Sequence, residues 1–226
     1  MTGRTFKLKL DIRDWWHIGT GQSRGGEVDA VVAREPDTGL PYVPGKTVRG
    51  LLRDAVATAA EVGAVPVTGV ETVFGSEVPG AALAKATRSQ DENATLRRAR
   101  FTTERGGLRV GDASLGPAWQ TWARRKPNEA KPLIDALFDS VAATAINDDG
   151  LVKEQTLRRI EVAAPMTLTA VVVWEAGEPS VDEVRGTLDA GAGFLTALGK
   201  GRHRGFGRCH AWIDGPLAYP RSEVPA

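Results

Sequence analysis

The segment from Gly199 to Arg208 has the composition best suited to chemistry with a phosphate-bearing ligand. Its glycines alternate with basic side chains, namely Lys200, Arg202, His203, Arg204 and Arg208. Glycine lets a backbone approach a ligand closely and present its N–H groups, while lysine and arginine neutralise phosphate charge. The segment therefore predicts a phosphate-binding loop, and the alternative is a glycine-rich turn with solvated charges.

A second positive segment begins at Gly45 and carries Lys46, Arg49 and Arg53 at the start of an expected helix. A helix N-terminus attracts phosphate because its first N–H groups have no partner within the helix. Five residues separate Gly39 from the Gly45-Lys46 pair, one more than a Walker A loop has, so nucleotide hydrolysis is not predicted here. The segment favours contact with one backbone phosphate, and the alternative is exposed polar positions on an amphipathic helix.

Asp29 is the carboxylate best placed for chemistry, because it lies just past a glycine-rich stretch. Asp29 or its neighbour Glu27 can hold a divalent cation or accept a proton from a ribose hydroxyl. A lone carboxylate is more often a surface residue or a turn cap, and that alternative stays open. The three histidines are scattered along the chain, so the sequence does not indicate a histidine metal site.

The composition limits the kinds of partner. Among 226 residues, 29 Lys and Arg balance 28 Asp and Glu, so any nucleic-acid site must be a local patch. Cys209 is the one cysteine and no secretory signal is recognisable, which predicts a cytoplasmic protein without an intrachain disulfide. The most apolar run, Ala163 to Trp174, is far shorter than the ~20 residues of a membrane-spanning helix, so no membrane partner is expected.

Hydrophobic periodicity predicts the elements that position these residues. Strands are expected at 6–13, 165–174 and 209–213, and helices at 45–61, 130–141 and 181–198. Pro179-Ser180 offers an N-cap for the last of these helices. The stretch 62–129 contains strand-like fragments such as Leu108–Val110, together with a basic cluster at 97–100. The order strand, helix, strands, strand, helix, strand predicts a single α+β domain over 1–226, with a ferredoxin-like core and long insertions.

Five segments, in this order, resemble the RAMP superfamily, and most closely the repeated backbone subunit of type III CRISPR effector complexes. They are Trp16–Gly21, Val28–Val31, Leu40–Arg53, Leu157–Val162 and Leu198–Arg208. They are similar to the family's h-I-G-x-G loop, its aspartate segment, its P-x-I-P-G helix entry, the L-R-x-x-E-x-V end of its thumb-like hairpin and its C-terminal glycine-rich loop. Lys46-Thr47 departs from the usual Ser-Ser of the helix entry and adds a charge there.

The resemblance implies an RRM-related core with insertions at about 62–129 and 142–162, the second including the thumb-like hairpin. It also implies partners: a guide RNA (crRNA), a complementary target RNA, further copies of the chain stacked head to tail, and other type III effector subunits. The residues that it assigns to RNA binding are His17, Lys46, Thr47, Arg49, Arg53, Arg158, Lys200, Arg202, His203, Arg204 and Arg208.

The resemblance makes Asp29 both the catalytic residue and the ligand of a divalent cation, Mg²⁺ or Mn²⁺, in an endoribonuclease that cuts target RNA. Two alternatives remain. Related subunits hold RNA without cutting it, so the chain is alternatively a binding scaffold. Guide-processing endoribonucleases of the same superfamily also carry the glycine loop, and His17 and His203 keep that alternative open.

Overall fold

A four-stranded antiparallel sheet forms the centre of the computed structural model, which describes residues 5–19, 21, 28–75, 106–144, 157–176 and 178–214. The core elements are β1 (Thr5–Ile12), α1 (Gly45–Glu61), β2 (Leu108–Val110), β5 (Met166–Trp174), α7 (Val181–Ala192) and β6 (Cys209–Asp214). The strands lie in the order β2-β5-β1-β6, and each pair is antiparallel. This mixture of helices with an antiparallel sheet confirms the predicted α+β class, and the β-α-β-β-α-β order fits a ferredoxin-like core.

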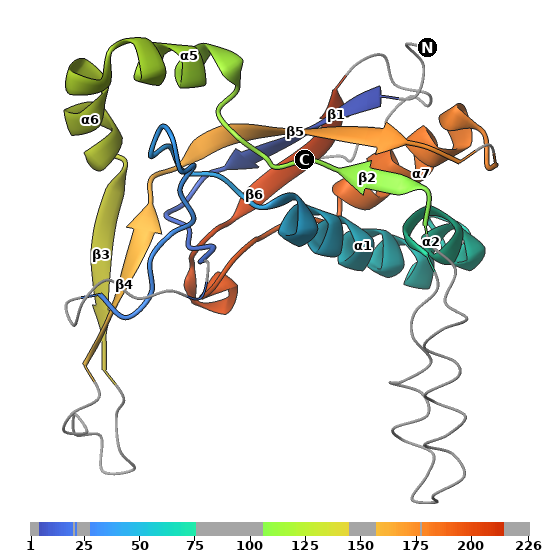
Figure 1. The fold of residues 1–226 in the computed structure, drawn as a ribbon. Helices are drawn as coiled ribbons and strands as arrows, with labels where there is room; N and C mark the ends of the chain where they lie inside the picture. Colours follow the sequence, from blue (N-terminus) through green and yellow to red (C-terminus); the bar gives the residue numbers. More distant parts are fainter. Residues whose placement is uncertain are drawn as a thin grey trace, which may run out of the picture.

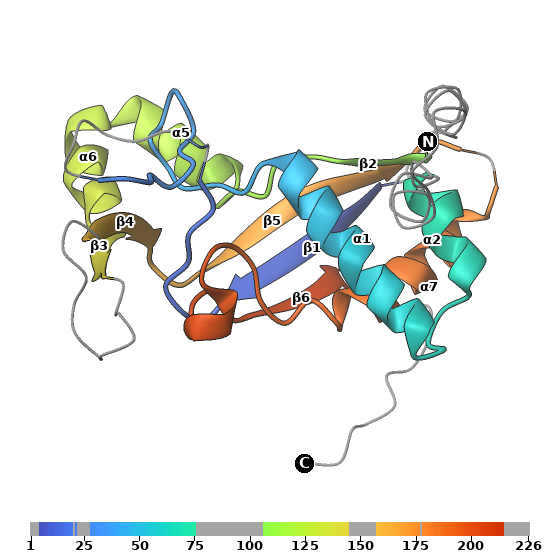
Figure 2. The same ribbon diagram turned by 90° about the horizontal axis from the view of Figure 1, so that it is seen from below.

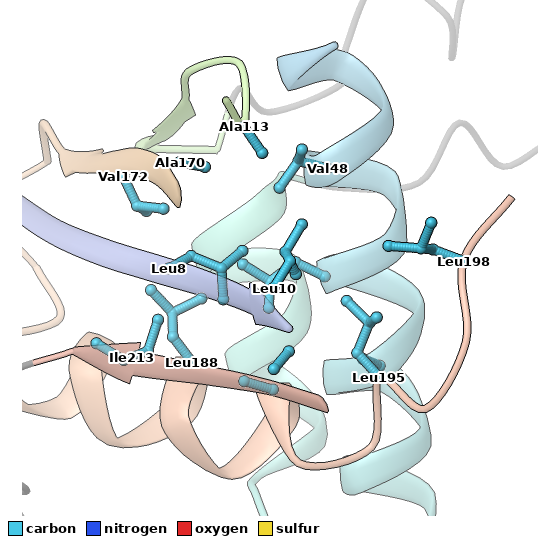
Figure 3. Packing of buried hydrophobic residues seen from close by; sticks show 14 of the residues in the cluster. Leu8, Leu10, Val48, Ala113, Ala170, Val172, Leu188, Leu195, Leu198 and Ile213 are labelled. Atoms are coloured by element: carbon cyan, nitrogen blue, oxygen red, sulfur yellow. The ribbon is translucent and has the colours of Figure 1, made fainter. Parts of the chain in front are cut away.

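The period-two pattern of β1 decides which face of the sheet is buried. Phe6, Leu8, Leu10 and Ile12 are buried, and the residues between them are half-buried or exposed. Helices α1 and α7 cover the buried face (Figures 1 and 2). Figure 3 shows Leu8 and Leu10 directed into the apolar layer formed with these helices. The sheet and the two helices therefore form a fixed platform for the loops at its end.

Helices α1 and α7 approach closely because α7 presents Gly191 to α1. A Cβ at this glycine would lie 2.2 Å from Val56 Cγ2. The start of α7 is a capping box between Ser180 and Glu183, which confirms the expected N-cap. The predicted end at 198 is wrong, because the helix stops at Ala192. Continuing it would remove the backbone bond from the Leu198 N–H to the Gly207 carbonyl, which closes the glycine loop.

The helix expected at 130–141 is only partly correct. Helix α6 spans Pro127–Asp135, and the chain then enters strand β3 (Phe138–Ala143). Strand β3 pairs with β4 (Arg158–Ala163) in a separate two-stranded sheet. The local spacing of apolar residues in 130–141 fits a helix. The second half of that stretch is a strand because it pairs with β4, and local spacing cannot reveal such a partner.

In the described part of the stretch 62–129, two helices escaped the sequence prediction, α2 (Val67–Phe74) and α5 (Pro117–Arg125). Within that stretch, Leu108–Val110 is confirmed as a strand, the core strand β2. Proline at the first helical position marks α5 and α6, and this signal was available in the sequence. Helices α5 and α6 pack on Leu40 in a small second core of Leu40, Ala123, Ala130 and Ile134.

The second core and the β3-β4 hairpin lie at one end of the sheet, and α2 lies at the other (Figures 1 and 2). The basic cluster at 97–100 and Glu27 lie outside the described residues. In the described part of the chain, no helix is both long enough and apolar enough to cross a membrane.

Candidate functional site

Four segments that are distant in the sequence meet in one pocket of about 460 Å³. Its lining residues are His17, Ile18, Gly19, Gly21, Asp29, Ala30, Thr47, Gly199 and Lys200. They come from the loop after β1, the segment of Asp29, the first turn of α1 and the glycine loop. The fold therefore brings together four of the predicted site residues, His17, Asp29, Thr47 and Lys200.

The glycine loop takes a shape that requires its glycines. Gly199, Gly201, Gly205 and Gly207 have positive φ angles of 82°, 80°, 82° and 65°. A Cβ at Gly199 would lie 2.3 Å from the His17 carbonyl oxygen. The Lys200 N–H donates to that same carbonyl at 2.9 Å. The loop is thus held tightly against the segment that carries His17.

The glycine loop exposes its charged side chains. Arg202, His203 and Arg204 form a short 3-10 helix, η2, and their side chains and that of Lys200 are exposed. None of these four side chains has an ion pair among the described residues. Arg208 differs, because its Nε lies 3.2 Å from an Asp14 carboxylate oxygen.

Asp29 is exposed at the pocket and is attached to the hairpin by two hydrogen bonds. Its N–H donates to the Arg159 carbonyl at 2.9 Å, and its Oδ2 accepts the Arg159 N–H at 2.8 Å. Both bonds use the backbone of Arg159, so the attachment does not depend on the side chain at that position. Sequence analysis did not single out Arg159, since nothing in the sequence marks a backbone contact.

Asp29 is the one protein carboxylate that lines the pocket in the described structure. Within the described ranges, no group of three or more His, Cys, Asp and Glu side chains is close enough to hold a metal ion. Asp29 Oδ2 accepts the Arg159 N–H, and among the described residues no hydrogen bond to Oδ1 is found. Mg²⁺ is commonly bound by one or two carboxylates together with substrate phosphates and water. A divalent cation at Asp29 would therefore need further ligands from a bound phosphate or from water.

His17 is buried, with 6% of its surface exposed. Its Nδ1 lies 2.7 Å from the Glu161 carbonyl oxygen. A carbonyl only accepts hydrogen bonds, so Nδ1 carries the proton, and in the neutral ring Nε2 is the acceptor. Nε2 lies beside Gly19, where a Cβ would approach it to 2.8 Å. The ring therefore helps to build the pocket wall, and contact with RNA by His17 stays a prediction.

The start of α1 contributes Lys46 and Thr47. Lys46 is exposed in the first turn, and Thr47 lines the pocket. Gly45 lies so close to β2 that a Cβ would be 2.4 Å from the Val110 carbonyl oxygen. Its N–H donates to the Asp112 carboxylate at 2.6 Å, which fixes the helix start. One end of α1 is thereby held at the pocket.

Arg49 and Arg53 lie away from the pocket and bind the end of α2 instead. Arg49 Nη2 donates to the Phe74 carbonyl, and Arg53 Nη1 donates to the Gly75 carbonyl at 3.0 Å. Burial lowers the pKa of the Arg49 guanidinium, and the nearby Arg53 charge lowers it further. These two arginines serve the fold as caps of α2, and the structure does not bring them to the pocket.

Arg158 is exposed at the start of β4 and does not line the pocket. Three residues further on, β4 reaches Glu161, whose buried side chain pairs with Arg34. Neither Glu161 nor Arg34 was predicted as a site residue. Glu161 lies inside the L-R-x-x-E-x-V segment of the hairpin, but that pattern does not predict that its carboxylate is buried and paired.

The fold and the pocket define an α+β protein with a ferredoxin-like core, a β-hairpin insertion and a glycine loop between its last helix and last strand. A family model described as RAMP superfamily matches residues 10–210, and the chain belongs to this superfamily. A comparison with curated protein sequences finds no match.

Two solved structures have a similar fold over nearly the whole chain. One is described as the Type III-B Cmr-beta bound to cognate target RNA, with a TM-score of 0.60 at 10% identity over 92% of this chain and 96% of that chain. The other is the apo state of Type III-B Cmr-beta, with a TM-score of 0.57 at 11% identity over 93% and 97%. At these identities the likeness concerns the fold.

Proposed function

We propose that this chain is a crRNA-binding backbone subunit of a type III CRISPR effector complex and that it cuts the complementary target RNA at Asp29. The observation that carries the proposal is the pocket, in which the glycine loop, the first turn of α1 and Asp29 meet. The superfamily match and the fold shared with a subunit of a target-bound type III-B complex support it. In this proposal, further copies of the chain and other effector subunits are its protein partners.

The guide backbone is expected to lie along the glycine loop and the start of α1. Lys200, Arg202 and Arg204 present charges without ion pairs in the described structure, and Lys46 adds a charge at a helix N-terminus. Phosphate contacts of this kind do not depend on base identity. Base pairing between guide and target would then supply the sequence specificity.

Asp29 is the residue that we assign to cleavage. Bound Mg²⁺ or Mn²⁺, held by Asp29 and the RNA, would act as a Lewis acid on the scissile phosphate. Asp29 Oδ2 is bonded to the Arg159 N–H, so the carboxylate keeps one orientation while Oδ1 stays available. In the step itself a ribose 2′-oxygen loses its proton and bonds to phosphorus while the bond to the 5′-oxygen breaks. The products are a cyclic phosphate and a 5′-hydroxyl, which takes up a proton.

The test of this proposal is Asp29→Asn in the complex reconstituted with crRNA. We expect target cleavage to fall by at least about 100-fold, because a lost acid-base or ligand carboxylate typically has this effect. Binding of crRNA should stay within about twofold, as for other exposed substitutions. The matched control is Asp54→Asn, which removes an exposed carboxylate of α1 outside the pocket. Chelation with EDTA should stop cleavage by the unchanged complex.

The other outcomes point to different functions. Guide binding without target cleavage in the unchanged complex would support a non-cleaving scaffold. Site-specific cutting of repeat RNA by the isolated chain would instead support a guide-processing endoribonuclease. Purification from the native host without nuclease, followed by sequencing of bound RNA, separates these cases first. Discrete short RNAs with one repeat-derived end are expected, and an RNA-free monomer would contradict the guide-binding proposal.

A further inference from the structure

Glu161 is a buried carboxylate with a complete set of partners. Its side chain is 9% exposed, and Oε1 lies 2.6 Å from Arg34 Nη2. Its Oε2 accepts the Val32 N–H at 2.9 Å, and its main-chain carbonyl accepts from His17 Nδ1. Carboxylates are seldom buried unless they are paired. Glu161 therefore joins strand β4 to both segments that supply the pocket with His17 and Asp29.

Arg34 extends this connection to the neighbouring elements. Its guanidinium carbon lies 3.4 Å from the centroid of the Phe138 ring at the start of β3. Its Nη1 lies 3.9 Å from an Asp135 carboxylate oxygen at the end of α6. One arginine thus contacts β3, β4 and α6, which together form the base of the hairpin.

The pair lies directly beside the backbone contacts that hold Asp29. The Glu161 N–H donates to the Ala30 carbonyl at 2.9 Å, and Ala30 pairs with Ile160 in a parallel bridge. One residue earlier in both segments lies the contact between Asp29 and Arg159. Asp29 is exposed, so water competes for its hydrogen bonds, whereas the Glu161–Arg34 pair is shielded. The shielded Glu161–Arg34 pair can therefore fix which residues of β4 and of the Asp29 segment lie opposite each other, and so hold the exposed Asp29–Arg159 contact in place.

We propose that Glu161 is a positioning residue: through Arg34 and Val32 it fixes the register between the Asp29 segment and β4, and so holds the Asp29 carboxylate and the His17 ring in place. This inference rests on the proposed function, because it assigns Glu161 a role in the cleavage carried out at Asp29. A buried ion pair often adds little net stability compared with an apolar pair of similar size. Its main effect here is on geometry.

The test compares Glu161→Gln and Glu161→Ala with a control at a second arginine–glutamate pair. Glu175→Gln removes the carboxylate that pairs with Arg109, where the side chains are 61% (Arg109) and 44% (Glu175) exposed. In the reconstituted complex, Glu161→Ala should lower kcat for target cleavage by about 10- to 100-fold, as is typical when a supporting contact of a site is lost. KM and crRNA binding should change by no more than about twofold.

Glu161→Gln separates positioning from a loss of folding. Glutamine keeps one carbonyl oxygen for Val32 but removes the negative charge opposite Arg34, so its kcat should lie between those of Glu161→Ala and the unchanged protein. Glu175→Gln should leave kcat within about twofold of the unchanged protein. Wild-type kcat in a folded Glu161→Ala complex overturns the inference. A rise in KM with unchanged kcat overturns it as well.

A second measurement keeps the inference separate from the proposed function. Amide hydrogen exchange of the isolated protein reports the Arg159 N–H, which Asp29 accepts. Glu161→Gln should speed exchange at this amide by about tenfold, as when a local contact of about 1.4 kcal/mol is lost. If the unchanged complex does not cleave target RNA, the proposed cleavage function is wrong. The exchange test still shows in that case whether Glu161 positions the Asp29 segment. Unchanged exchange at Arg159 contradicts that role whatever the enzyme activity.

Discussion

The glycine loop and the first turns of α1 have similar sequences but different roles in the structure. Both combine glycine with arginine and lysine, and both were predicted to contact phosphate. In the loop, Arg202 and Arg204 are exposed without ion pairs among the described residues. In α1, Arg49 and Arg53 bind carbonyls at the end of α2. The difference shows that the fold uses the charges of one basic cluster internally and leaves those of the other exposed.

The physical cause of this difference is whether carbonyl groups without a hydrogen-bond partner lie within reach of the basic side chains. The last carbonyls of a helix have no N–H partner within the helix, and they attract cations. Helix α2 ends at Phe74, close enough to α1 for both arginines to reach it. In the glycine loop, backbone N–H groups already bind the carbonyls of His17, Trp15 and Gly201. Among the described residues, the side chains of Arg202 and Arg204 have no acceptor that pairs with them.

The largest expected effect comes from breaking the loop itself. A Cβ at Gly207, where φ is 65°, would lie 2.0 Å from the Leu198 carbonyl oxygen. Gly207→Ala should lower the free energy of unfolding by about 1–2 kcal/mol for the left-handed backbone, plus about 1–3 kcal/mol for overpacking. Gly205→Ala is the matched control, because its φ is also positive but its Cβ would meet nothing within 4 Å. Urea unfolding measures both, and equal losses would contradict the packing described for Gly207.

A double substitution in each region tests the comparison directly. Arg202→Ala with Arg204→Ala should weaken crRNA binding and reduce the slope of log K against log salt by about 0.7 per phosphate contact. The unfolding free energy should stay within about 0.5 kcal/mol, because both side chains are exposed.

Arg49→Ala with Arg53→Ala is expected to show the opposite pattern. It should lower the unfolding free energy by about 1–3 kcal/mol, because carbonyls at the end of α2 lose charged donors. The salt slope for RNA binding should not change. A reduced slope for the α1 pair, or an unchanged slope for the loop pair, would reverse the assignment of the two regions. Salt titrations and urea unfolding on the same samples measure both quantities.

The smallest expected effect concerns Cys209, at the base of the glycine loop. Burial, and to a lesser extent the nearby Asp11 charge, raises the pKa of its thiol to about 12. The unfolded chain loses this proton near its ordinary pKa of 9.0. Between these values the folded state binds more protons, so stability should fall with rising pH by at most about 1.4 kcal/mol per unit. Urea unfolding from pH 8 to 10.5 should show a steeper fall than for Cys209→Ala, and equal slopes would mean that the thiol is accessible to water.

Much of the fold followed from local patterns. The alternation of β1, the apolar spacing of α1 and the capping residues of α7 each depend on neighbours within a few positions, and each was predicted. The second half of the helix predicted at 130–141 was wrong because β3 exists only by pairing with β4. Helices α2 and α5 are short, and such helices depend on tertiary contacts for most of their stability. For α5 the proline at its first position was a local signal that the prediction did not use.

The candidate site likewise combines features that the local sequence determines with features that only the tertiary structure determines. The sequence by itself determined the residue types: glycines that allow positive φ angles, cations for phosphate and one carboxylate after a glycine-rich stretch. The tertiary structure alone decided which of these residues meet, because the pocket combines segments up to about 180 positions apart and depends on backbone contacts such as that between Asp29 and Arg159. It also decided that the Arg49 guanidinium binds inside the fold and that Glu161 is buried against Arg34. A sequence specifies donors and acceptors, but only packing determines which of them remain unpaired.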